Sequence, residues 1–328
     1  MREARAALLT PLVALLLALA AVPRPAPAQE TQPEEKEPGA PYVPTPMSVV
    51  TEMLELARVS ASDTVYDLGS GDGRLPITAA RLHGSRGLGV ELDSALVARS
   101  RRRARQAGVD SLVRFVRGDL FETDIRPATV LTLYLFPEMN ERLRPRILRE
   151  MEPGNRVVAH DFSMGAWDAD SVVQVRERDR ELNLFQEVAG GWLGFGGQPE
   201  TGVDTLLPEV EAVEPRATVY LWVIPADAGG TWALALPSGG TARIRIDQRF
   251  QELRATAVEG IESVTAARAR ADTVELTVGT GGETLRLRGT ISGDRMRGSA
   301  GGGDAWSARR VEDTDASILE WEEAAGTG

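Results

Sequence analysis

The chain has 328 residues, of which 42% are hydrophobic, and its net charge is −11. This length suffices for one large domain or two ordinary ones with a real core, and the acidic balance argues against nucleic acid as a partner. The absence of cysteine excludes disulfides, thiolate metal sites and thiol nucleophiles. The two histidines, His83 and His160, are too few for a histidine-rich metal site, so no metal centre is predicted.

The first residues have the layout of a secretory signal peptide. Two arginines precede an apolar run from Ala6 to Val22, and an A-x-A site, Ala26-Pro27-Ala28, comes before Gln29. We therefore expect residues 1–28 to be a signal peptide that exports the protein to the periplasm or the medium. The run is at the border of the length that spans a bilayer. A retained membrane anchor and a plain alanine-rich leader are thus the alternatives.

Alternating strands and helices are predicted over residues 41–226, after a disordered, charged, proline-rich linker over 29–40. Thr45 is placed to cap a first helix, with Pro46 at its first position. The alternation predicts an α/β fold with a Rossmann-like, doubly wound parallel sheet. Strands are predicted over 64–68, 87–92, 111–118, 128–136, 155–162 and 217–226, of which the last could close the sheet antiparallel. Helices are predicted over 74–82, 95–106 and 137–151.

Two segments depart from this alternation. Residues 163–216 are less regular and are interpreted as an insertion. Further on, short runs such as "ARIRID" and "VELTV" alternate at period two between glycine-rich turns, which predicts a small antiparallel all-β module, a sandwich or a barrel, over 227–312. Trp232 and Trp306 could meet if the first and last strands of this module pair. The remaining 16 residues, 313–328, form an acidic tail.

The stretch "VYDLGSGDGR" places a glycine-rich loop between a predicted strand and a predicted helix. Bare backbone lets a ligand come close, and a helix N-terminus offers amide donors. A dinucleotide site would want G-x-G-x-x-G, but the third glycine comes one residue early and Arg74 stands where that motif needs glycine. The loop acids would repel a pyrophosphate and suit a ligand with an ammonium and a sulfonium group. The candidate binding residues are Asp67, Gly69, Ser70, Gly71, Asp72 and Gly73.

Two carboxylates follow at the ends of the next two predicted strands. Glu91 comes about 20 residues after the loop, where a carboxylate can accept from both hydroxyls of a ribose. Asp119, in "RGDLF", is placed to accept from an exocyclic adenine amine. Its neighbours Leu120 and Phe121 could flank the ring. Together with the loop, these residues predict a site for a nucleoside that carries a cationic group.

In this arrangement the chain resembles the class I S-adenosylmethionine-dependent methyltransferases. A closer likeness runs through "YVPTP", "GVELD", "GDLF", "LTLYLFPEMNERLRP", "PGNRVVAHDF" and "MGAW". These motifs resemble the mitochondrial-type protein-lysine methyltransferases that modify the c-type protein of ATP synthase and an adenine nucleotide carrier, and their bacterial relatives. The likeness covers about residues 41–168, and Ala166 stands where the family has an acid, which puts the substrate in doubt.

The resemblance implies S-adenosylmethionine as cofactor, with Tyr42 and Thr45 folding over it. The alternative is that "YVPTP" is only the end of a polyproline linker and a helix cap. The sulfonium is already activated, so methyl transfer needs in-line approach, exclusion of water and an uncharged nucleophile, and no metal. The acceptor is then expected to be a protein lysine or a small amine.

Candidate residues for handling the amine lie after the fourth and fifth predicted strands. Each also has a structural interpretation: Tyr134 as a core aromatic, Glu138 as a first-turn acid that matches the helix dipole, and Asp161 as a structural hydrogen-bond partner beside His160. Asn140 could orient an amine. The candidate catalytic residues are Tyr134, Glu138, Asn140 and Asp161.

Two other functions stay open at this point. The α/β segment could be a vestigial scaffold in an exported or membrane-anchored binding protein whose function lies in the β module. The enzyme could also methylate a small molecule, since the sequence does not separate protein from small-molecule acceptors. The presence of Asp67, Glu91 and Asp119 favours an enzyme.

Overall fold

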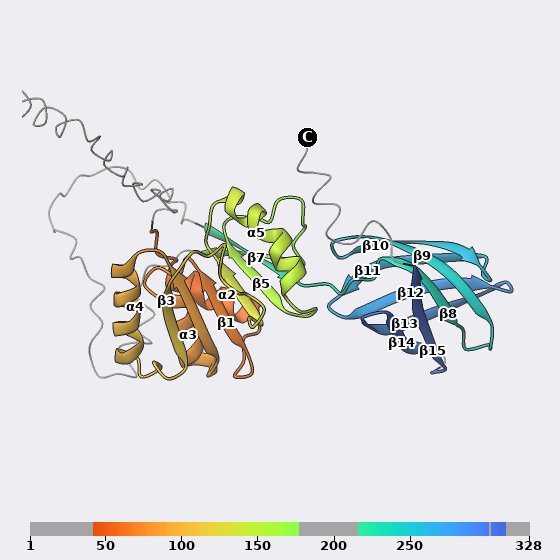
Figure 1. Ribbon diagram of the computed structural model, residues 1–328, viewed down its shortest axis with the longest axis horizontal. Coiled ribbons are helices and arrows are strands. Elements are labelled where there is room, and N and C mark those ends of the chain that lie inside the picture. Colours follow the sequence, from red (N-terminus) through yellow and green to blue (C-terminus); the bar gives the residue numbers. More distant parts are fainter. Residues whose placement is uncertain (1–41, 177–215, 302, 313–328) are drawn as a thin grey trace, which may run out of the picture. The chain divides into compact units, whose positions relative to one another are not determined.

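A computed structural model describes residues 42–176, 216–301 and 303–312 (Figure 1). Among these residues no helix is both long and apolar enough to cross a bilayer. The predicted leader, most of the predicted linker and the acidic tail lie outside the described residues.

The first part of the chain forms a seven-stranded sheet in the order β3-β2-β1-β4-β5-β7-β6. Strands β1 to β5 run parallel, whereas β7 pairs antiparallel with β5 and with β6. The predicted doubly wound sheet is therefore confirmed, including its antiparallel closure. The strands are β1 (Thr64–Leu68), β2 (Arg86–Glu91), β3 (Val113–Arg117), β4 (Val130–Leu133), β5 (Arg156–His160), β6 (Ser171–Arg176) and β7 (Arg216–Val223).

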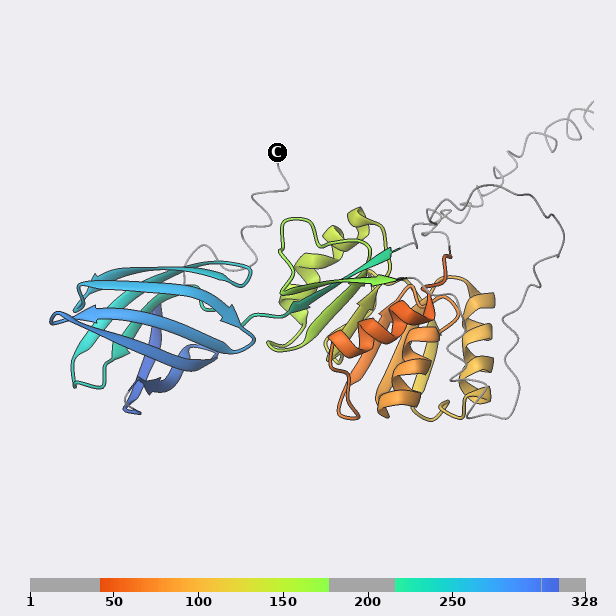
Figure 2. The same ribbon diagram turned by 180° about the vertical axis from the view of Figure 1, so that it is seen from behind.

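Helices cover both faces of this sheet. Figure 2 shows α2 (Met47–Leu56), α3 (Arg74–His83) and α4 (Ser94–Gln106) side by side on one face, while α5 (Pro137–Glu150) packs on the other. Strand residues therefore alternate between the two cores, and all four residues of β4 are buried. A strand covered on both faces is apolar throughout, which explains the run that predicted it.

Two details of the prediction were wrong. The helix α2 has Pro46 at its N-cap and no side chain caps it, so Thr45 does not act as the cap. The supposed insertion also contains β6, the edge strand of the sheet. The strand has only six residues, and the exposed and buried classes in it follow no clean alternation, which left little periodic signal. The rest of the segment, 177–215, lies outside the described residues.

The second part is a closed barrel of eight antiparallel strands. Its first and last strands pair, as expected, and Trp232 and Trp306 are both buried in the same core cluster. Gly289 and Gly298 face each other because a Cβ on Gly298 would lie 1.9 Å from the Arg288 carbonyl oxygen. The strands are β8 (Gly230–Ala235), β9 (Thr241–Arg249), β10 (Glu252–Glu259), β11 (Ser263–Arg270), β12 (Thr273–Thr280), β13 (Glu283–Ser292), β14 (Arg295–Ala300) and β15 (Ala305–Glu312).

The turn between β9 and β10 contributes to the core of the sheet. Phe250 is buried in the same cluster as Trp167, with ring centroids 5.9 Å apart. Gln251 accepts from the Trp167 indole at 2.7 Å and donates to the Asp168 carbonyl at 2.7 Å. These contacts bear on the predicted separability of the β module, which stays a prediction.

We expect a chain that ends at Ala226 to keep the sheet folded but to unfold at a lower temperature. The sheet would lose the packing of Phe250, a loss of about 3 kcal/mol for a buried aromatic, and Trp167 would lose its acceptor. Circular dichroism melting of the truncated chain tests this, with Phe250→Ala in the full chain as the comparison. A truncated chain that is unfolded would show that the barrel belongs to the fold of the first part.

Candidate active site

The glycine loop has the backbone that its sequence requires. Gly69, Gly71 and Gly73 all have left-handed φ values of 81°, 51° and 79°. Side chains rarely adopt this conformation, which glycine reaches freely. The loop leaves β1 and Gly73 caps α3, so the loop amides lie at a helix N-terminus on the carboxyl edge of the sheet.

The loop is closely lined at Gly71. A Cβ built there would lie 2.5 Å from Cε2 of Tyr42, so the tyrosine ring lies directly over the bare backbone. The Gly71 carbonyl accepts from the Ser100 hydroxyl at 2.9 Å, and its N–H donates to Glu91 Oε2 at 2.9 Å. The structure thus brings together Tyr42, the loop and Glu91, as the sequence predicts for a covered ligand site.

Asp67 is buried at the end of β1. Its Oδ1 accepts from the Thr132 hydroxyl at 2.7 Å. Burial is the largest influence on its pKa and, with the charges of Glu91 and Asp72, it outweighs the Thr132 hydrogen bond and raises the pKa to about 7. A carboxyl group with this pKa is poised to respond to a cationic ligand.

Asp72 is held differently from Asp67. Its side chain is 1% exposed and forms ion pairs with Arg74, at 2.8 Å, and with Arg103. Burial alone would raise the pKa of Asp72, but the Arg74 hydrogen bonds and the two cationic charges lower it to about 2. Arg74 also donates to the Thr45 carbonyl at 2.6 Å. The carboxylate therefore fixes the loop to α4 and to the segment before α2, a role that the sequence interpretation missed.

Arg103 belongs to the run "RSRRRAR", which reads as a solvated helix surface. Its side chain is only 10% exposed. The signal was available in principle, because Ser100 and Arg103 lie on the same face of α4 and Ser100 is fully buried.

Glu91 and Asp119 lie at the ends of β2 and β3. Glu91 accepts from Asp93 N–H at 3.0 Å through Oε1, in addition to Gly71 through Oε2, and Asp93 in turn caps α4. Asp119 accepts from Phe121 N–H at 2.8 Å. Leu120 is buried in the sheet core, so it supports the site from beneath. Both carboxylates stand at the carboxyl edge beside the glycine loop.

Aromatic rings gather where β4 and β5 end. The Tyr134 ring lies 3.9 Å from the His160 ring and 6.2 Å from the Phe162 ring, centroid to centroid. Phe136, 45% exposed, lies 6.2 Å from Phe162. Tyr134 is thus part of an aromatic cluster that reaches the surface, and β4 ends before it rather than at Phe136. Phe162 was not among the predicted site residues.

His160 and Asp161 have distinct surroundings. His160 is 1% exposed, and its two ring nitrogens make no hydrogen bond, although Nε2 lies 3.4 Å from Asp161 Oδ2. Burial, opposed by Asp161, lowers the pKa of His160, so the ring is neutral at pH 7. Asp161, at φ 61°, exchanges hydrogen bonds with Thr218 through its own N–H and Oδ1, at 2.7 and 2.8 Å. This matches the structural interpretation of Asp161.

Glu138 and Asn140 are separated by exposure. Glu138 is exposed in the first turn of α5. Asn140 is fully buried and donates to the carbonyls of Phe162 and Ser163 at 3.2 and 3.4 Å. Asn140 therefore shapes the segment after β5, whereas Glu138 is free to meet an incoming group.

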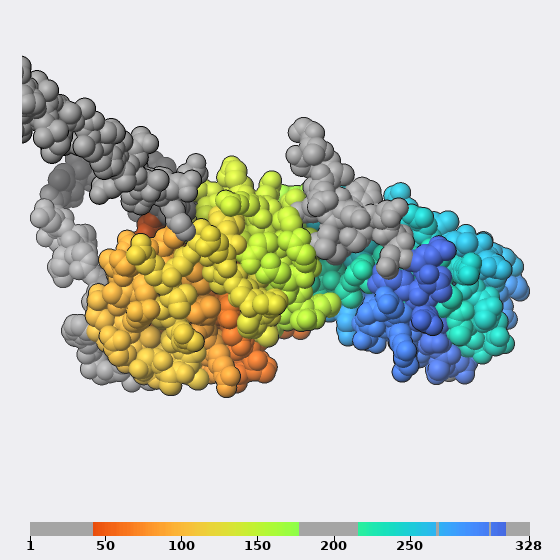
Figure 3. All heavy atoms as spheres, viewed as in Figure 1, coloured from red at the N-terminus to blue at the C-terminus, as the bar shows by residue number. Residues whose placement is uncertain are grey.

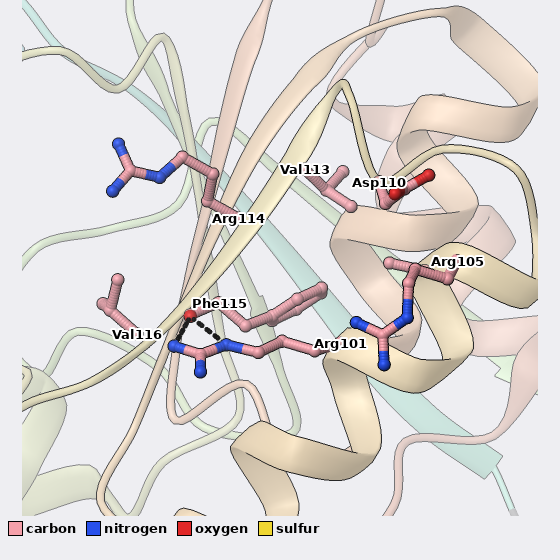
Figure 4. A pocket seen from close by; sticks show the side chains of 8 residues that line it. Arg101, Arg105, Asp110, Val113, Arg114, Phe115 and Val116 are labelled. Carbon is pink, nitrogen blue, oxygen red and sulfur yellow. Dashed lines mark hydrogen bonds between the residues drawn. The ribbon is translucent and has the colours of Figure 1, made fainter.

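A pocket of about 300 Å³ lies elsewhere, along the edge strand β3 and helix α4 (Figure 4). Arg101 donates to the Phe115 carbonyl at 3.0 and 2.7 Å and so covers an edge that would otherwise be open. The pocket contains none of the predicted site residues, and the labelled arginines point in different directions (Figure 4). It carries no assignment.

Known proteins share this part of the chain. The family model described as the ANTKMT methyltransferase domain matches residues 67–171. A protein-lysine N-methyltransferase of Saccharolobus islandicus (strain REY15A) is 40% identical over 154 residues, which are 47% of this chain and 96% of that protein. A Caenorhabditis elegans lysine N-methyltransferase, named for the C-type protein of ATP synthase, is 35% identical, over 48% of this chain and 81% of that protein.

A solved structure, described as an RNA methyltransferase from Salinibacter ruber in complex with S-adenosyl-L-homocysteine, is 44% identical and covers 56% of this chain and 94% of that one, with a TM-score of 0.43. Fold, site and relatives together define an S-adenosylmethionine-dependent methyltransferase. The chain belongs to the protein-lysine N-methyltransferase family of the ANTKMT methyltransferase domain. The barrel, from residue 230 onward, lies beyond the matched domain.

Proposed function

We propose that the chain methylates the side-chain amine of a protein lysine by direct in-line transfer. The observation that carries this proposal is the loop of three left-handed glycines, with Gly71 bound to Glu91 and covered by Tyr42. The names of the relatives, which include lysine N-methyltransferases of ATP synthase and of adenine nucleotide translocase, support lysine as the acceptor. They also favour an enzyme over the binding-protein alternative.

The residues of the loop edge fit S-adenosylmethionine. The space over Gly71 is one that a Cβ would fill, and the surrounding carboxylates suit a cationic ligand rather than a pyrophosphate. We propose that Asp67 takes the ammonium group, Glu91 the ribose hydroxyls and Asp119 the adenine amine, with Tyr42 and Thr45 closing over them. The cofactor supplies a methyl group already activated by its sulfonium.

The aromatic cluster is proposed as the acceptor side of the site. Tyr134, Phe136 and Phe162 would pack around the methylene groups of a lysine and remove water from its amine, which favours the neutral form. Glu138, exposed above them, would orient the incoming ammonium. Asn140 and Asp161 act on the acceptor only through the backbone that they hold.

The test is transfer of a labelled methyl group from S-adenosylmethionine to three offered acceptors: the membrane-ring protein of ATP synthase, total RNA and a small free amine. Methyl-lysine in the protein, identified by mass spectrometry, is the expected product. The Tyr134→Ala variant should lose transfer while it still binds the cofactor. Methylation of RNA or of the free amine in place of the protein would overturn the proposed acceptor.

Glu91→Ala should weaken S-adenosylmethionine binding by about 2 kcal/mol, or roughly 30-fold, because charge-assisted hydrogen bonds are lost. Calorimetric titration measures this directly. Asp93→Ala is the control, because it removes the neighbouring cap of α4 and leaves the ribose partner in place. Unchanged affinity in folded Glu91→Ala protein would refute the ribose assignment.

The affinity for S-adenosylmethionine should rise with pH between 5.5 and 7.5, by about tenfold per unit below the Asp67 pKa of about 7. A cationic group favours the ionised carboxylate, so protonation of Asp67 at low pH competes with binding. Titrations at several pH values test this, with Asp67→Asn expected to flatten the profile. A profile that is unchanged in Asp67→Asn would assign the pH dependence to another group.

We further propose export by the N-terminal segment, as a cleaved signal peptide or a retained anchor. Sequencing of the mature N-terminus should begin near Gln29, or the protein should sediment with membranes. An intact N-terminus on a protein found in the cytoplasm would exclude both forms.

A further inference from the structure

The barrel differs in charge from the rest of the chain. Residues 230–312 contain twelve arginines and no lysine against ten carboxylates, a net charge of +2 in a chain of −11. The positive charge is concentrated on one side, over strands that adjoin in the barrel order β14-β15-β8-β9. In Figure 3 the outer surfaces of β14 and β15, in blue, adjoin that of β8, in turquoise.

Four arginines form what we call the arginine face: Arg243, Arg295, Arg297 and Arg309. All four are exposed, and each stands next to a residue whose side chain is buried in the barrel, such as Ile244, Met296 or Ala308. Since successive side chains of a strand point to opposite faces, the arginines point outward.

The register brings these arginines together. Arg295 lies opposite Arg309, Arg309 opposite Ala233, and Ala233 opposite Arg243, so three arginines share one row across four strands. Arg297 stands two residues from Arg295 on the same side of β14. With strands about 4.8 Å apart, the row spans about 14 Å. Like charges directly opposite each other destabilise a sheet, so the fold gains nothing from the pair Arg295–Arg309.

None of the four arginines makes an ion pair or a side-chain hydrogen bond in the described part of the chain. Other arginines of the barrel do: Arg245 lies 3.1 Å from Asp247, and Arg288 lies 3.6 Å from Glu275. The carboxylates are thus placed around the arginine face and not on it, which leaves its guanidinium groups available to an external anion.

We propose that the arginine face binds the anionic phospholipid headgroups of a membrane surface. The outer wall of a barrel is convex, and its guanidinium groups are spread over a row rather than converging on one point. Such a row meets an extended anionic surface better than a single small ion, and each guanidinium matches a phosphate in a bidentate way. Val311, 43% exposed on β15 two residues after Arg309, adds an apolar contact of the kind that interfacial segments use.

The alternatives fit the surface less well. Binding of single-stranded nucleic acid uses exposed aromatic rings for base stacking, and Trp232 and Trp306 are buried inside the barrel. The net charge of −11 would also repel a long polyanion. An acidic protein remains as a distinct outcome for the experiment. The proposal does not depend on methyl transfer, because no residue of the arginine face belongs to the candidate active site.

The test is co-sedimentation of the full chain with vesicles of phosphatidylcholine alone and of phosphatidylcholine with about one third phosphatidylglycerol. Each basic residue near an anionic surface contributes about 1 kcal/mol. We therefore expect at least tenfold stronger binding to the anionic vesicles and loss of that difference at high salt. Any contribution of the N-terminal apolar run would be the same on both vesicles, so the difference reports the charged surface.

The decisive variant is the triple substitution Arg295→Glu, Arg297→Glu and Arg309→Glu, which should abolish the preference for anionic vesicles. The matched control reverses Arg99, Arg102 and Arg105, three exposed arginines of α4, and should keep the preference. Both variants should bind S-adenosylmethionine as the unmodified chain does, which verifies their fold. Equal binding to both vesicles, an unchanged preference in the first variant, or capture of RNA or an acidic protein by this face in place of vesicles would overturn the proposal.

Discussion

Valine at Gly71 should abolish S-adenosylmethionine binding, with a loss of at least 100-fold in affinity, while the protein stays folded. The Cβ of any side chain would lie 2.5 Å from the Tyr42 ring, which covers the loop. The backbone at φ 51° would also have to hold a β-branched residue in the left-handed region. Calorimetric titration with the cofactor and circular dichroism of the same sample measure the two halves of this prediction.

A matched control separates strain from obstruction. Gly108, after α4, has a similar φ of 68°, but a Cβ there would meet nothing within 4 Å. Gly108→Val should therefore share the backbone strain of Gly71→Val and keep cofactor binding. If Gly71→Val binds within threefold of the unmodified chain, the loop is not where the cofactor approaches the backbone.

The order of chemistry along the chain could be predicted because it depends on local sequence. Glycines at alternate positions, a carboxylate at each of three strand ends and the apolar run of β4 are all local signals, and the sheet brings their positions to one edge. Parallel strands that are joined by helices leave few other topologies. This is why Gly71, Glu91 and Tyr42 were predicted to meet before the structure placed them in contact.

Contacts between distant segments could not be predicted in the same way. Asp72 reads as a ligand-facing acid because its partner Arg103 lies 31 residues later, within a run of similar arginines. Gln251 hydrogen-bonds Trp167 over 84 residues, and nothing local marks either residue for the other. The arginine face likewise depends on the closure of the barrel, which pairs β15 with β8 and sets Arg309 in a row with Arg243.

The ion pairs of Asp72 imply a second large effect. Asp72→Ala should destabilise the protein by about 3–5 kcal/mol, because two mostly buried guanidinium groups, of Arg74 and Arg103, would lose the carboxylate that compensates them. Thermal and urea unfolding measure this loss. Asp124→Ala is the control, because Asp124 pairs with Arg126 at the exposed surface and its removal should leave the melting temperature nearly unchanged.

The pH dependence of stability follows from the same carboxylate. The folded-state pKa of Asp72, about 2, is below its ordinary value of 3.8. The ionised form therefore stabilises the fold fully above about pH 4, and this contribution of about 2 kcal/mol is lost as the pH falls through 2. The deletion costs more than protonation, since it also removes the hydrogen-bonding oxygens. Between pH 5 and 2 the unfolding free energy of the unmodified chain should fall more steeply than that of Asp72→Ala. Parallel curves, or a variant as stable as the unmodified chain at pH 7, would mean that Arg74 and Arg103 find other partners and that the loop is not held through Asp72.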